Sequence, residues 1–404
     1  PLPIALLPGR RNSQGVDLSD DQELAALEAG LAQWDGVPLR AEPSRPPSAA
    51  PAVAAPDTGA LIRNPADHDD VVGTMVEATL AEVATAVALA VERGAEWSAT
   101  PAAARAACLE RAADLMEAER VTLLALAVRE AGKTLANAVA EVREAVDFLR
   151  YYAAQARTEL GGPEIVPIGP VVAISPWNFP LAIFVGEVGA ALAAGNPVLA
   201  KPAEQTPLLA AAAVRILHRA GVPPAALQLL PGRGETVGAS LVADPRVAGV
   251  IFTGSTEVAR LIHRQLASRD DDPVLIAETG GQNAMIVDSS ALPEQVVADA
   301  LSSAFDSAGQ RCSALRILCL QDDVAPEMLS MLEGAMRELA IGDPRHLSTD
   351  IGPVIDAEAR AGLNAHVERM RAVGLKVVEM PLPPACARGT FVAPTLVDLG
   401  NIRG

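Results

Sequence analysis

Lysine is nearly absent from this chain: it occurs three times in 404 residues, whereas arginine occurs 29 times. Aromatic residues make up only 3%, and the formal net charge is −18. An acidic surface of this kind disfavours binding to nucleic acid or to anionic lipid. Arg and Lys are not interchangeable where a compact ammonium group is needed. The lysine at position 201 is therefore a candidate for a specific contact, although chance explains any single lysine as well.

Long apolar runs and paired cysteines are also missing. The hydrophobic stretches are too short and too often interrupted to span a bilayer. The chain starts without the basic segment of a secretory signal. The cysteines show neither the C-x-x-C spacing of a zinc site nor a disulfide framework, which fits the reducing cytosol. They are Cys108, Cys312, Cys319 and Cys386. We expect a cytoplasmic protein without membrane contact and without a metal.

The rest of the composition is that of a globular protein of two or three domains, with 50% hydrophobic and 20% charged residues. The first half has helical periodicity, with proline and glycine at the expected helix boundaries. From residue 167 onward, short apolar strands alternate with helices up to residue 397, which is typical of a parallel, doubly wound sheet. The helices expected in the first half are 20–34, 80–97, 102–131 and 133–157.

One cysteine has surroundings suited to a nucleophile. It lies in the stretch Gly309-Gln310-Arg311-Cys312-Ser313. A thiolate is reactive where a nearby cation or a helix N-terminus stabilises it. The glycine lets the backbone approach a substrate closely, and the serine can hydrogen-bond that substrate. The commoner role of a single cysteine is to fill space in a core.

A carboxylate stands at the end of another apolar strand, in Glu278-Thr279-Gly280-Gly281. Sites gather at strand ends in α/β folds. Glu278 can act as a general base for a water that attacks a thioester. A solvated acid at a strand end is the alternative.

Two charged residues near a third strand end are suited to a nucleotide. Lys201 can hydrogen-bond a ribose, and Glu204 can accept a hydrogen bond from the ribose 2′-OH. A carboxylate there would repel a 2′-phosphate, so the sequence favours NAD over NADP. The glycines at 232, 234 and 238 miss the G-x-G-x-x-G spacing and indicate little by themselves.

Two turns complete the set. Thr253-Gly254-Ser255 joins a strand to a helix, so its backbone N–H groups and the serine hydroxyl can hold a pyrophosphate; an ordinary βα turn explains it equally well. Asn178, in the turn after the strand 171–175, can form an oxyanion hole with the backbone N–H of Cys312. An asparagine that only stabilises the turn is the alternative.

Together these turns resemble the motifs of the aldehyde dehydrogenase superfamily, in the family's order and spacing from about residue 60 to the end. The matching stretches are Ser175-Pro176-Trp177-Asn178-Phe179-Pro180, Lys201-Pro202-Ala203-Glu204-Gln205-Thr206-Pro207, Phe252-Thr253-Gly254-Ser255, Glu278-Thr279-Gly280-Gly281 and Gly309-Gln310-Arg311-Cys312.

The resemblance implies an NAD-dependent oxidation in which Cys312 forms a thiohemiacetal with an aldehyde. Glu278 then activates the water that hydrolyses the thioester, and Asn178 contributes to the oxyanion hole. It also implies a homo-oligomer. The residues expected at the cofactor are Ile174, Ser175, Pro176, Trp177, Lys201, Ala203, Glu204, Gly234, Thr253, Gly254, Ser255, Thr279 and Gly280. Those expected at the substrate are Asn178, Phe179, Arg311 and Ser313.

A narrower resemblance is to the dehydrogenase half of the bifunctional proline utilisation A proteins. It rests on the stretches 10–15, 129–152 and 312–316. That half oxidises L-glutamate γ-semialdehyde, in equilibrium with Δ1-pyrroline-5-carboxylate, to L-glutamate, the second step of proline catabolism. The resemblance implies that Ser313 helps to hold the substrate carboxylate. It also implies covalent continuity with a flavin-containing proline dehydrogenase domain.

The expected fold class is α/β, in three parts. Residues 1–60 form an N-terminal arm with a Pro/Ala-rich linker at 41–56, 61–280 a helical region with a Rossmann-like, doubly wound NAD-binding domain, and 281–404 an α/β catalytic domain. The family's Glu-x-Phe-Gly-Pro motif does not occur before the chain stops at residue 404. The catalytic domain is therefore expected to be incomplete at its C-terminus. The isolated chain is expected to aggregate or to turn over aldehyde poorly.

Three other functions are compatible with part of this pattern. A CoA-acylating semialdehyde dehydrogenase shares the fold and the cysteine but usually lacks the acid, so Glu278 argues against it. A hydrolytic dehydrogenase for another semialdehyde or an aliphatic aldehyde is the closest alternative. A catalytically inactive scaffold is disfavoured by the intact Cys312, Glu278 and Asn178, and titration with NAD would separate it from an enzyme.

Overall fold

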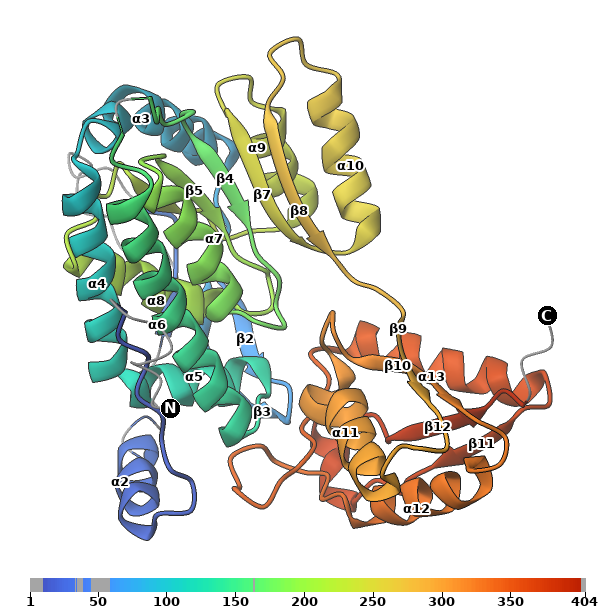
Figure 1. Ribbon diagram of the computed structural model, residues 1–404. Coiled ribbons are helices and arrows are strands. Elements are labelled where there is room, and N and C mark those ends of the chain that lie inside the picture. The colour runs from blue at the N-terminus through green and yellow to red at the C-terminus, as the bar shows by residue number, and fades with distance from the viewer. Residues whose placement is uncertain (1–9, 33, 35–38, 45–58, 163, 401–404) are drawn as a thin grey trace. The chain divides into compact units, whose positions relative to one another are not determined.

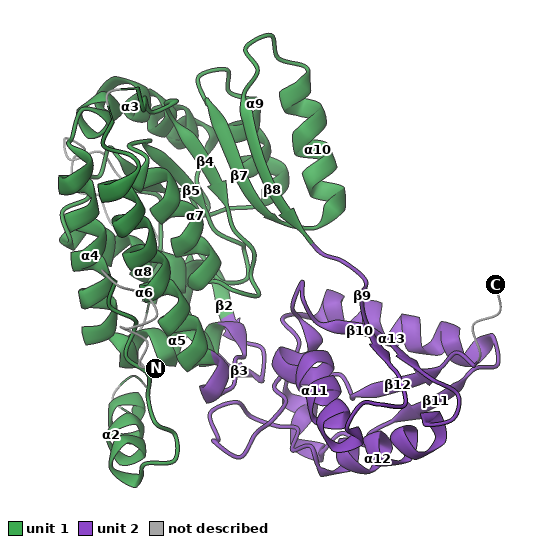
Figure 2. Ribbon diagram, in the orientation of Figure 1, with its two compact units in different colours: residues 1–62, 71–130, 138–279 green, residues 63–70, 131–137, 280–404 purple. Residues whose placement is uncertain are grey.

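The computed structural model describes residues 10–32, 34, 39–44, 59–162 and 164–400. The chain divides into two compact units (Figure 2). Unit 1 comprises residues 1–62, 71–130 and 138–279, and unit 2 comprises residues 63–70, 131–137 and 280–404.

Unit 1 is built on a five-stranded parallel sheet with the order β6-β5-β4-β7-β8 (Figure 1). Its central strands are short and apolar on both faces, as expected for a sheet that helices cover on both sides. The predicted parallel, doubly wound sheet is confirmed. The strands are β4 (Val171–Ile174), β5 (Val198–Lys201), β6 (Leu227–Leu229), β7 (Gly249–Gly254) and β8 (Val274–Thr279).

The order of the strands reverses next to β4. The chain runs outward from β4 through β5 to β6 and then returns to the other side of β4 as β7 and β8. Because crossovers between parallel strands are right-handed, the helices before and after this return cover opposite faces of the sheet. The first pair is α7 (Ala182–Ala193) and α8 (Pro207–Arg219), and the second is α9 (Ala239–Ala243) and α10 (Thr256–Ala267).

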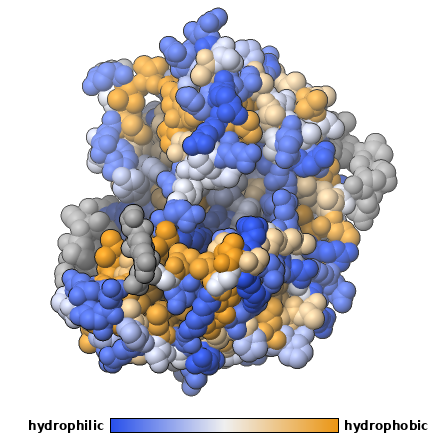
Figure 3. All heavy atoms as spheres, turned by 90° about the vertical axis from the view of Figure 1, so that its right-hand side faces the viewer, coloured by the Kyte–Doolittle hydropathy of each residue, from blue (hydrophilic) through white to orange (hydrophobic). Residues whose placement is uncertain are grey.

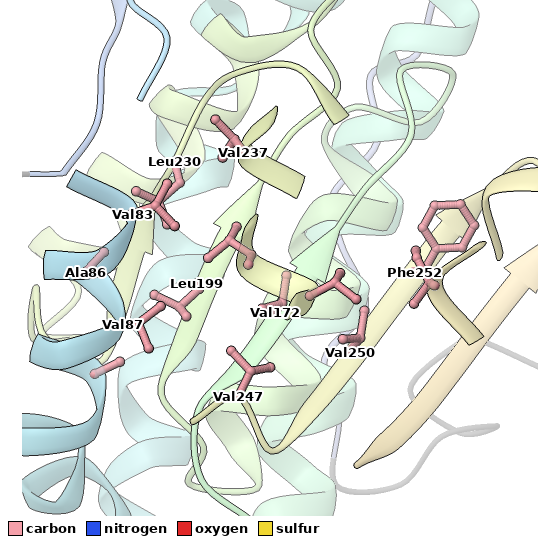
Figure 4. Close-up of a cluster of buried hydrophobic side chains, with 14 of the residues drawn as sticks. Val83, Ala86, Val87, Val172, Leu199, Leu230, Val237, Val247, Val250 and Phe252 are labelled. Carbon is pink, nitrogen blue, oxygen red and sulfur yellow. The ribbon is translucent and has the colours of Figure 1, made fainter. Parts of the chain in front are cut away.

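One hydrophobic cluster joins the sheet to α3 (Leu80–Ser98), α9 and α10 (Figure 4). Val172, Leu199 and Val250 contribute from the sheet, and Val87 contributes from α3. Each is fully buried, and burial of such a side chain contributes about 1.5–3 kcal/mol. This cluster fixes the strands and thereby the positions of their carboxyl ends.

The helical region differs from the prediction in one place. The single helix expected at 102–131 is interrupted at Glu119, whose φ of −100° and ψ of 18° are not helical. The N–H of Glu119 nevertheless caps the first helix by donating to the Leu115 carbonyl at 2.9 Å. The resulting helices are α4 (Ala102–Ala118) and α5 (Arg120–Ala131), followed by α6 (Leu135–Thr158).

The N-terminal segment contains the expected helix and a small sheet that the sequence did not predict. The helix is α2 (Asp21–Ala32), and the sheet has the order β1-β3-β2. Most of the Pro/Ala-rich linker expected at 41–56 lies outside the described residues. The three strands are β1 (Leu39–Ala41), β2 (Ala60–Asn64) and β3 (Asp67–Met75).

Unit 2 contains two small sheets. The strands β9 (Asn283–Val287) and β10 (Leu315–Leu320) pair in parallel, and α11 (Pro293–Phe305) and α12 (Ala325–Glu338) pack with them around a core that includes Leu315, Leu332 and Met336. The helix α13 (Ala357–Ala372) precedes the second sheet.

The βα alternation predicted up to residue 397 is wrong for the end of unit 2. The last strands, β11 (Lys376–Glu379) and β12 (Thr395–Asp398), pair antiparallel. Within the described chain only a short 3₁₀ turn, η3 (Pro384–Arg388), lies between them. Antiparallel strands do not need a crossover helix, so the predicted alternation of strands and helices does not continue here.

No helix in the described part of the chain is both long and apolar enough to cross a membrane. Apolar side chains nevertheless occur among the polar ones on the face shown in Figure 3. The exposed large apolar side chains of α10 and β8 are Val258, Leu261, Val274 and Ile276.

The buried acid Glu130 gives a testable pH dependence. Its side chain accepts hydrogen bonds from the N–H groups of Leu208 and Leu209, at 2.6 and 2.8 Å, at the start of α8. Burial raises the pKa of Glu130 from 4.5 to about 8. Between these values the folded state holds a proton that the unfolded state has released. The free energy of unfolding therefore falls as pH rises through this window, by up to about 1.4 kcal/mol per pH unit.

The variant Glu130→Gln lacks this titration. Thermal unfolding measured from about pH 5 to pH 8 should show the wild type losing stability relative to the variant as pH rises. Unfolding midpoints that change in parallel for the two proteins would contradict a proton on Glu130.

Candidate active site

The carboxyl ends of the sheet strands in unit 1 bring most of the predicted site residues of that unit to one edge. Ile174, the last residue of β4, pairs with Lys201 of β5 and with Phe252 of β7. Thr253 of β7 pairs with Glu278 of the neighbouring strand β8. In open α/β sheets ligands bind at this edge, at the point where the strand order reverses. Here that point lies between β4 and β7.

Lys201 and Glu204 form an ion pair at the end of β5. The Lys201 Nζ lies 3.1 Å from Glu204 Oε1, which also accepts a hydrogen bond from the Gly234 N–H at 2.5 Å. Burial lowers the pKa of the Lys201 ammonium, and the charge of Glu204 opposes this effect. Lys201 is buried, whereas the Glu204 side chain is one-third exposed. A carboxylate is therefore presented at the sheet edge and held in place from two sides.

The turn after β7 has the features of an anion site. Ser255 is the N-cap of α10, and its Oγ accepts a hydrogen bond from the Val258 N–H at 3.2 Å. The serine hydroxyl keeps its own proton for donation, and the first N–H groups of α10 point out of the helix. A Cβ at Gly254, the last residue of β7, would lie 2.6 Å from the ring of Phe252, so the turn has no room for a larger residue there.

Asn178 and Phe179 lie in the half-buried turn between β4 and α7. Glu141 of α6 holds the end of this turn, because its Oε1 accepts hydrogen bonds from the N–H groups of Leu181 and Ala182, both at 2.9 Å. Glu141 was not among the predicted site residues, and nothing in the local sequence connects it with a turn 40 residues away. The turn that carries Asn178 is therefore fixed at the N-terminus of α7.

Glu278 is the penultimate residue of β8, and its side chain is exposed. The neighbouring Thr253 donates a hydrogen bond from its Oγ1 to Glu187 Oε1 at 2.7 Å. Glu187 is a buried acid of α7 that the sequence motifs did not single out. Two carboxyl groups therefore flank Thr253, one on the adjacent strand and one on the helix.

In unit 2, Cys312 lies in a tight loop between α11 and β10 and is partly exposed. The loop needs a glycine at 309, because its φ is +70° and a Cβ there would lie 2.7 Å from the Ala304 carbonyl. Ser307 and Ala308 also have positive φ, at 57° and 54°. The loop that carries the thiol is therefore sharply folded.

Asn283 fixes the backbone on the other side of the thiol. Its Nδ2 donates to the carbonyl of Cys312 at 2.7 Å and to the carbonyl of Ala314 at 3.0 Å. Gln310 closes the loop by donating to the carbonyl of Pro353 at 3.2 Å and accepting from the Ile355 N–H at 2.9 Å. Asn283 and Gln310 were not among the predicted site residues, because the contacts named here join segments that are distant in the chain.

Arg311 is paired within the same loop. Its guanidinium donates to Asp306 at 2.5 Å, and Asp306 also accepts from Asn137 Nδ2 at 2.5 Å. A hollow of about 310 Å³ lies beside the loop and opens next to Ser313. Its lining residues are Met285, Asp299, Ser302, Ser303, Arg311 and Ser313.

The predicted catalytic residues are thus divided between the two units. Asn178 and Glu278 belong to unit 1, and Cys312 belongs to unit 2. Within unit 1 the predicted cofactor residues gather at the carboxyl edge of the sheet. Within unit 2 the thiol, Arg311 and Ser313 share one loop. The described residues contain no group of three or more side chains arranged to hold a metal ion.

Nucleotide-dependent α/β enzymes with a cysteine nucleophile combine a parallel sheet, whose strand order reverses, with a thiol on a fixed loop. This chain has both features. Residues 54–400 match the model of the Aldehyde dehydrogenase family. The chain belongs to this family, as its motifs indicated.

The similar curated proteins are of two kinds. The chain is 56% identical to the Bifunctional protein PutA of Escherichia coli (strain K12) over 416 residues, which are 99% of this chain and 31% of that protein. It is 35% identical to the 1-pyrroline-5-carboxylate dehydrogenase of Geobacillus kaustophilus (strain HTA426), over 82% of this chain and 67% of that enzyme. The chain therefore spans about a third of the length of the PutA proteins that it matches.

Solved structures give the same picture of the fold. A bifunctional proline utilization A (PutA) protein superposes with a TM-score of 0.84 at 47% identity, over 98% of this chain and 38% of that one. A 1-pyrroline-5-carboxylate dehydrogenase from Thermus, with bound NAD, superposes with a TM-score of 0.87 at 30% identity, over 96% of this chain and 77% of that one.

Proposed function

We propose that this chain carries an NAD-dependent aldehyde dehydrogenase activity that oxidises L-glutamate γ-semialdehyde to L-glutamate. The observation that carries the proposal is the placement of the family's motif residues. Most of the residues that we propose for the cofactor lie at the carboxyl ends of the sheet strands of unit 1, whose order reverses next to β4, and Cys312 lies on a loop braced by Asn283 in unit 2. The 56% identity to a PutA protein supports this choice of substrate.

The proposed reaction begins with attack of the Cys312 thiolate on the aldehyde carbon. Asn283 holds the Cys312 carbonyl and so orients the peptide that carries the thiol. The resulting oxyanion would be stabilised by the Asn178 amide and by the backbone N–H of Cys312. Asn178 belongs to unit 1 and Cys312 belongs to unit 2.

The thioester that remains on Cys312 must then be hydrolysed. Glu278, exposed at the carboxyl edge of the sheet, is the proposed general base. It takes a proton from a water molecule, whose oxygen attacks the thioester carbon and releases the carboxylic acid. The cysteine leaves as a thiolate, so no further acid is needed for this step.

The residues at the carboxyl edge fit a dinucleotide. Glu204 offers a carboxylate for ribose hydroxyl groups, Lys201 lies beside it, and Ser255 with the N-terminus of α10 offers donors for a pyrophosphate. NAD, when bound, supplies the hydride acceptor for the oxidation. Ile174, Ser175, Pro176, Trp177, Ala203, Gly234, Thr253, Gly254, Thr279 and Gly280 complete the proposed cofactor set.

The preference for NAD over NADP can be tested at Glu204. Its carboxylate would repel a 2′-phosphate, so the kcat/KM for NAD should exceed that for NADP. Glu204→Gln should narrow this ratio by about tenfold or more, equivalent to about 1.4 kcal/mol. Glu235→Gln is a matched control, because Glu235 is exposed near the same turn and its loss changes the net charge equally. Equal kcat/KM values for the two cofactors in the wild type would contradict the placement of Glu204 at the 2′ position.

The substrate carboxylate requires polar groups near the thiol. Ser313 is exposed beside Cys312 and lines the hollow of about 310 Å³. Arg311 lines the same hollow, although Asp306 already neutralises part of its charge. We propose Ser313, Arg311, Phe179 and Asn178 as the substrate contacts.

The relatives named PutA are bifunctional, and the chain aligns with them over 99% of its length. We propose that in the cell it works in the cytoplasm as a homo-oligomer, together with a flavin-dependent proline dehydrogenase to which it is covalently joined. Formation of NADH by the full-length protein, measured against a panel of semialdehydes and aliphatic aldehydes, tests the proposed activity. A clear preference for an aliphatic aldehyde would overturn the choice of substrate.

A further inference from the structure

Glu187 is a buried acid that none of the steps above uses. It is 7% exposed in the middle of α7, and its Oε1 accepts the hydrogen bond from Thr253. Its Oε2 is buried and has no hydrogen-bond partner among the residues that the structure describes. Loss of solvation raises the pKa of Glu187 well above its usual value. Burial therefore favours the protonated carboxyl, and its proton belongs on Oε2, because Oε1 accepts from the threonine.

The register of the sheet shows which residue stands beside Thr253 on the face that Glu187 covers. Val250 and Leu275 are paired on β7 and β8, and both pack into the cluster on the side of α3 and α10. Three positions further along each strand, the paired residues Thr253 and Glu278 point to the opposite face, since side chains alternate along a strand. Thr253 contacts Glu187 of α7 on that face. Glu278 lies on the same face, one strand spacing of about 5 Å away.

Building on the proposed function, we propose that Glu187 is a positioning residue for Glu278, to whose carboxylate it donates a hydrogen bond from its otherwise unpartnered Oε2. The bond would hold Glu278 in the orientation from which it takes a proton from water. Glu187 keeps its own proton throughout, so the stoichiometry of the hydrolysis does not change. A neutral donor next to a carboxylate stabilises the charged form of that carboxylate.

Few other titratable groups face α7. Arg105 of α4 donates to the Ala193 carbonyl at the end of the helix, and Glu141 of α6 accepts from its first N–H groups. The ring of Tyr152 lies against Gly189. On the sheet side, the described partners of the Glu187 carboxyl are the neutral Thr253 and, in the proposal, Glu278. Ionisation of Glu187 would place a second negative charge beside Glu278.

Two substitutions separate positioning from a structural role. Glu187→Met keeps the length of the side chain but removes the donor. We expect the first-turnover burst of NADH to remain, steady turnover to fall by about tenfold or more, and its acidic pH limb to move up by about one pH unit. Glu187→Gln keeps a donor, so we expect turnover within about threefold of the wild type. In the wild type we expect steady turnover to fall at alkaline pH, because Glu187 ionises. The glutamine of Glu187→Gln cannot ionise, so this fall should be absent in the variant.

Glu130→Gln is the matched control, because it also replaces a buried acid of unit 1 with its amide but leaves α7 unchanged. It should alter neither pH limb. If Glu187→Met and Glu187→Gln both match the wild type in burst, steady turnover and both pH limbs, the proposal is overturned. Should Glu187→Met fail to fold, the alkaline limb of Glu187→Gln decides alone.

A readout independent of turnover uses infrared spectroscopy of the full-length protein. The C=O band of protonated Glu187 is assigned by its loss in Glu187→Gln and by its persistence in Glu130→Gln. We expect this band to shift in Glu278→Ala, because the acceptor is gone. An unshifted band would overturn the hydrogen bond even if the enzyme is active. If the wild type gives no NADH burst but the C=O band shifts in Glu278→Ala, the proposed reaction is overturned. The hydrogen bond between Glu187 and Glu278 is then still supported.

Discussion

Replacement of the nucleophile is expected to have the largest effect. Cys312→Ala should abolish NADH formation from the aldehyde, because no other group on the braced loop can form the covalent intermediate. Binding of NAD should survive, since all of its proposed residues except Gly280 belong to unit 1 and the thiol belongs to unit 2. Activity is measured by NADH absorbance in the full-length protein, and NAD binding by calorimetry.

Cys319→Ala is the control for this experiment. Cys319 lies on β10, is partly exposed like Cys312, and has no comparable loop around it. It should retain activity. Full turnover in Cys312→Ala would end the covalent mechanism, and a loss of both activity and NAD binding would point to a structural role of the thiol.

The second large effect is expected at the general base. Glu278→Gln should lower steady turnover by about 100-fold or more, which is the usual size of a general-base contribution. The first-turnover burst of NADH should remain, because attack by the thiol and oxidation precede the hydrolysis. Rapid-mixing measurements of NADH absorbance separate the two phases.

Glu257→Gln is the matched control, because Glu257 is an exposed acid near the same sheet edge, in the first turn of α10. It should leave both phases intact. If Glu278→Gln lost the burst together with steady turnover, Glu278 would have a role before the thioester forms, such as holding the cofactor.

The sequence by itself determined the elements whose hydrophobic pattern is local. The helix expected at 80–97 is found at Leu80–Ser98, and the helix expected at 133–157 is found at Leu135–Thr158. Short apolar strands alternating with helices could form only a covered, parallel sheet. The motif residues could also be placed at strand ends, because each follows an apolar run directly. These local features were sufficient to identify the family.

Tertiary structure decided what depends on pairing between distant segments. The strands β1 and β2 are only three and five residues long, and β3 begins with four polar residues, so only their mutual hydrogen bonds make them a sheet. The antiparallel pairing of β11 with β12 likewise leaves no mark in either strand alone. A pattern of period two indicates a strand but not its partner or its direction.

The same limit applies to the site. Cys312, Glu278 and Asn178 stand in recognisable stretches, so the sequence was enough to select them. The residues that hold these groups in place could not be selected in this way, because their partners are far away in the chain. Asn283 braces a carbonyl 29 residues away, and Glu187 meets Thr253 across 66 residues. The role of a buried polar side chain depends on the partner with which it forms a hydrogen bond. Only the fold brings that partner within hydrogen-bonding distance.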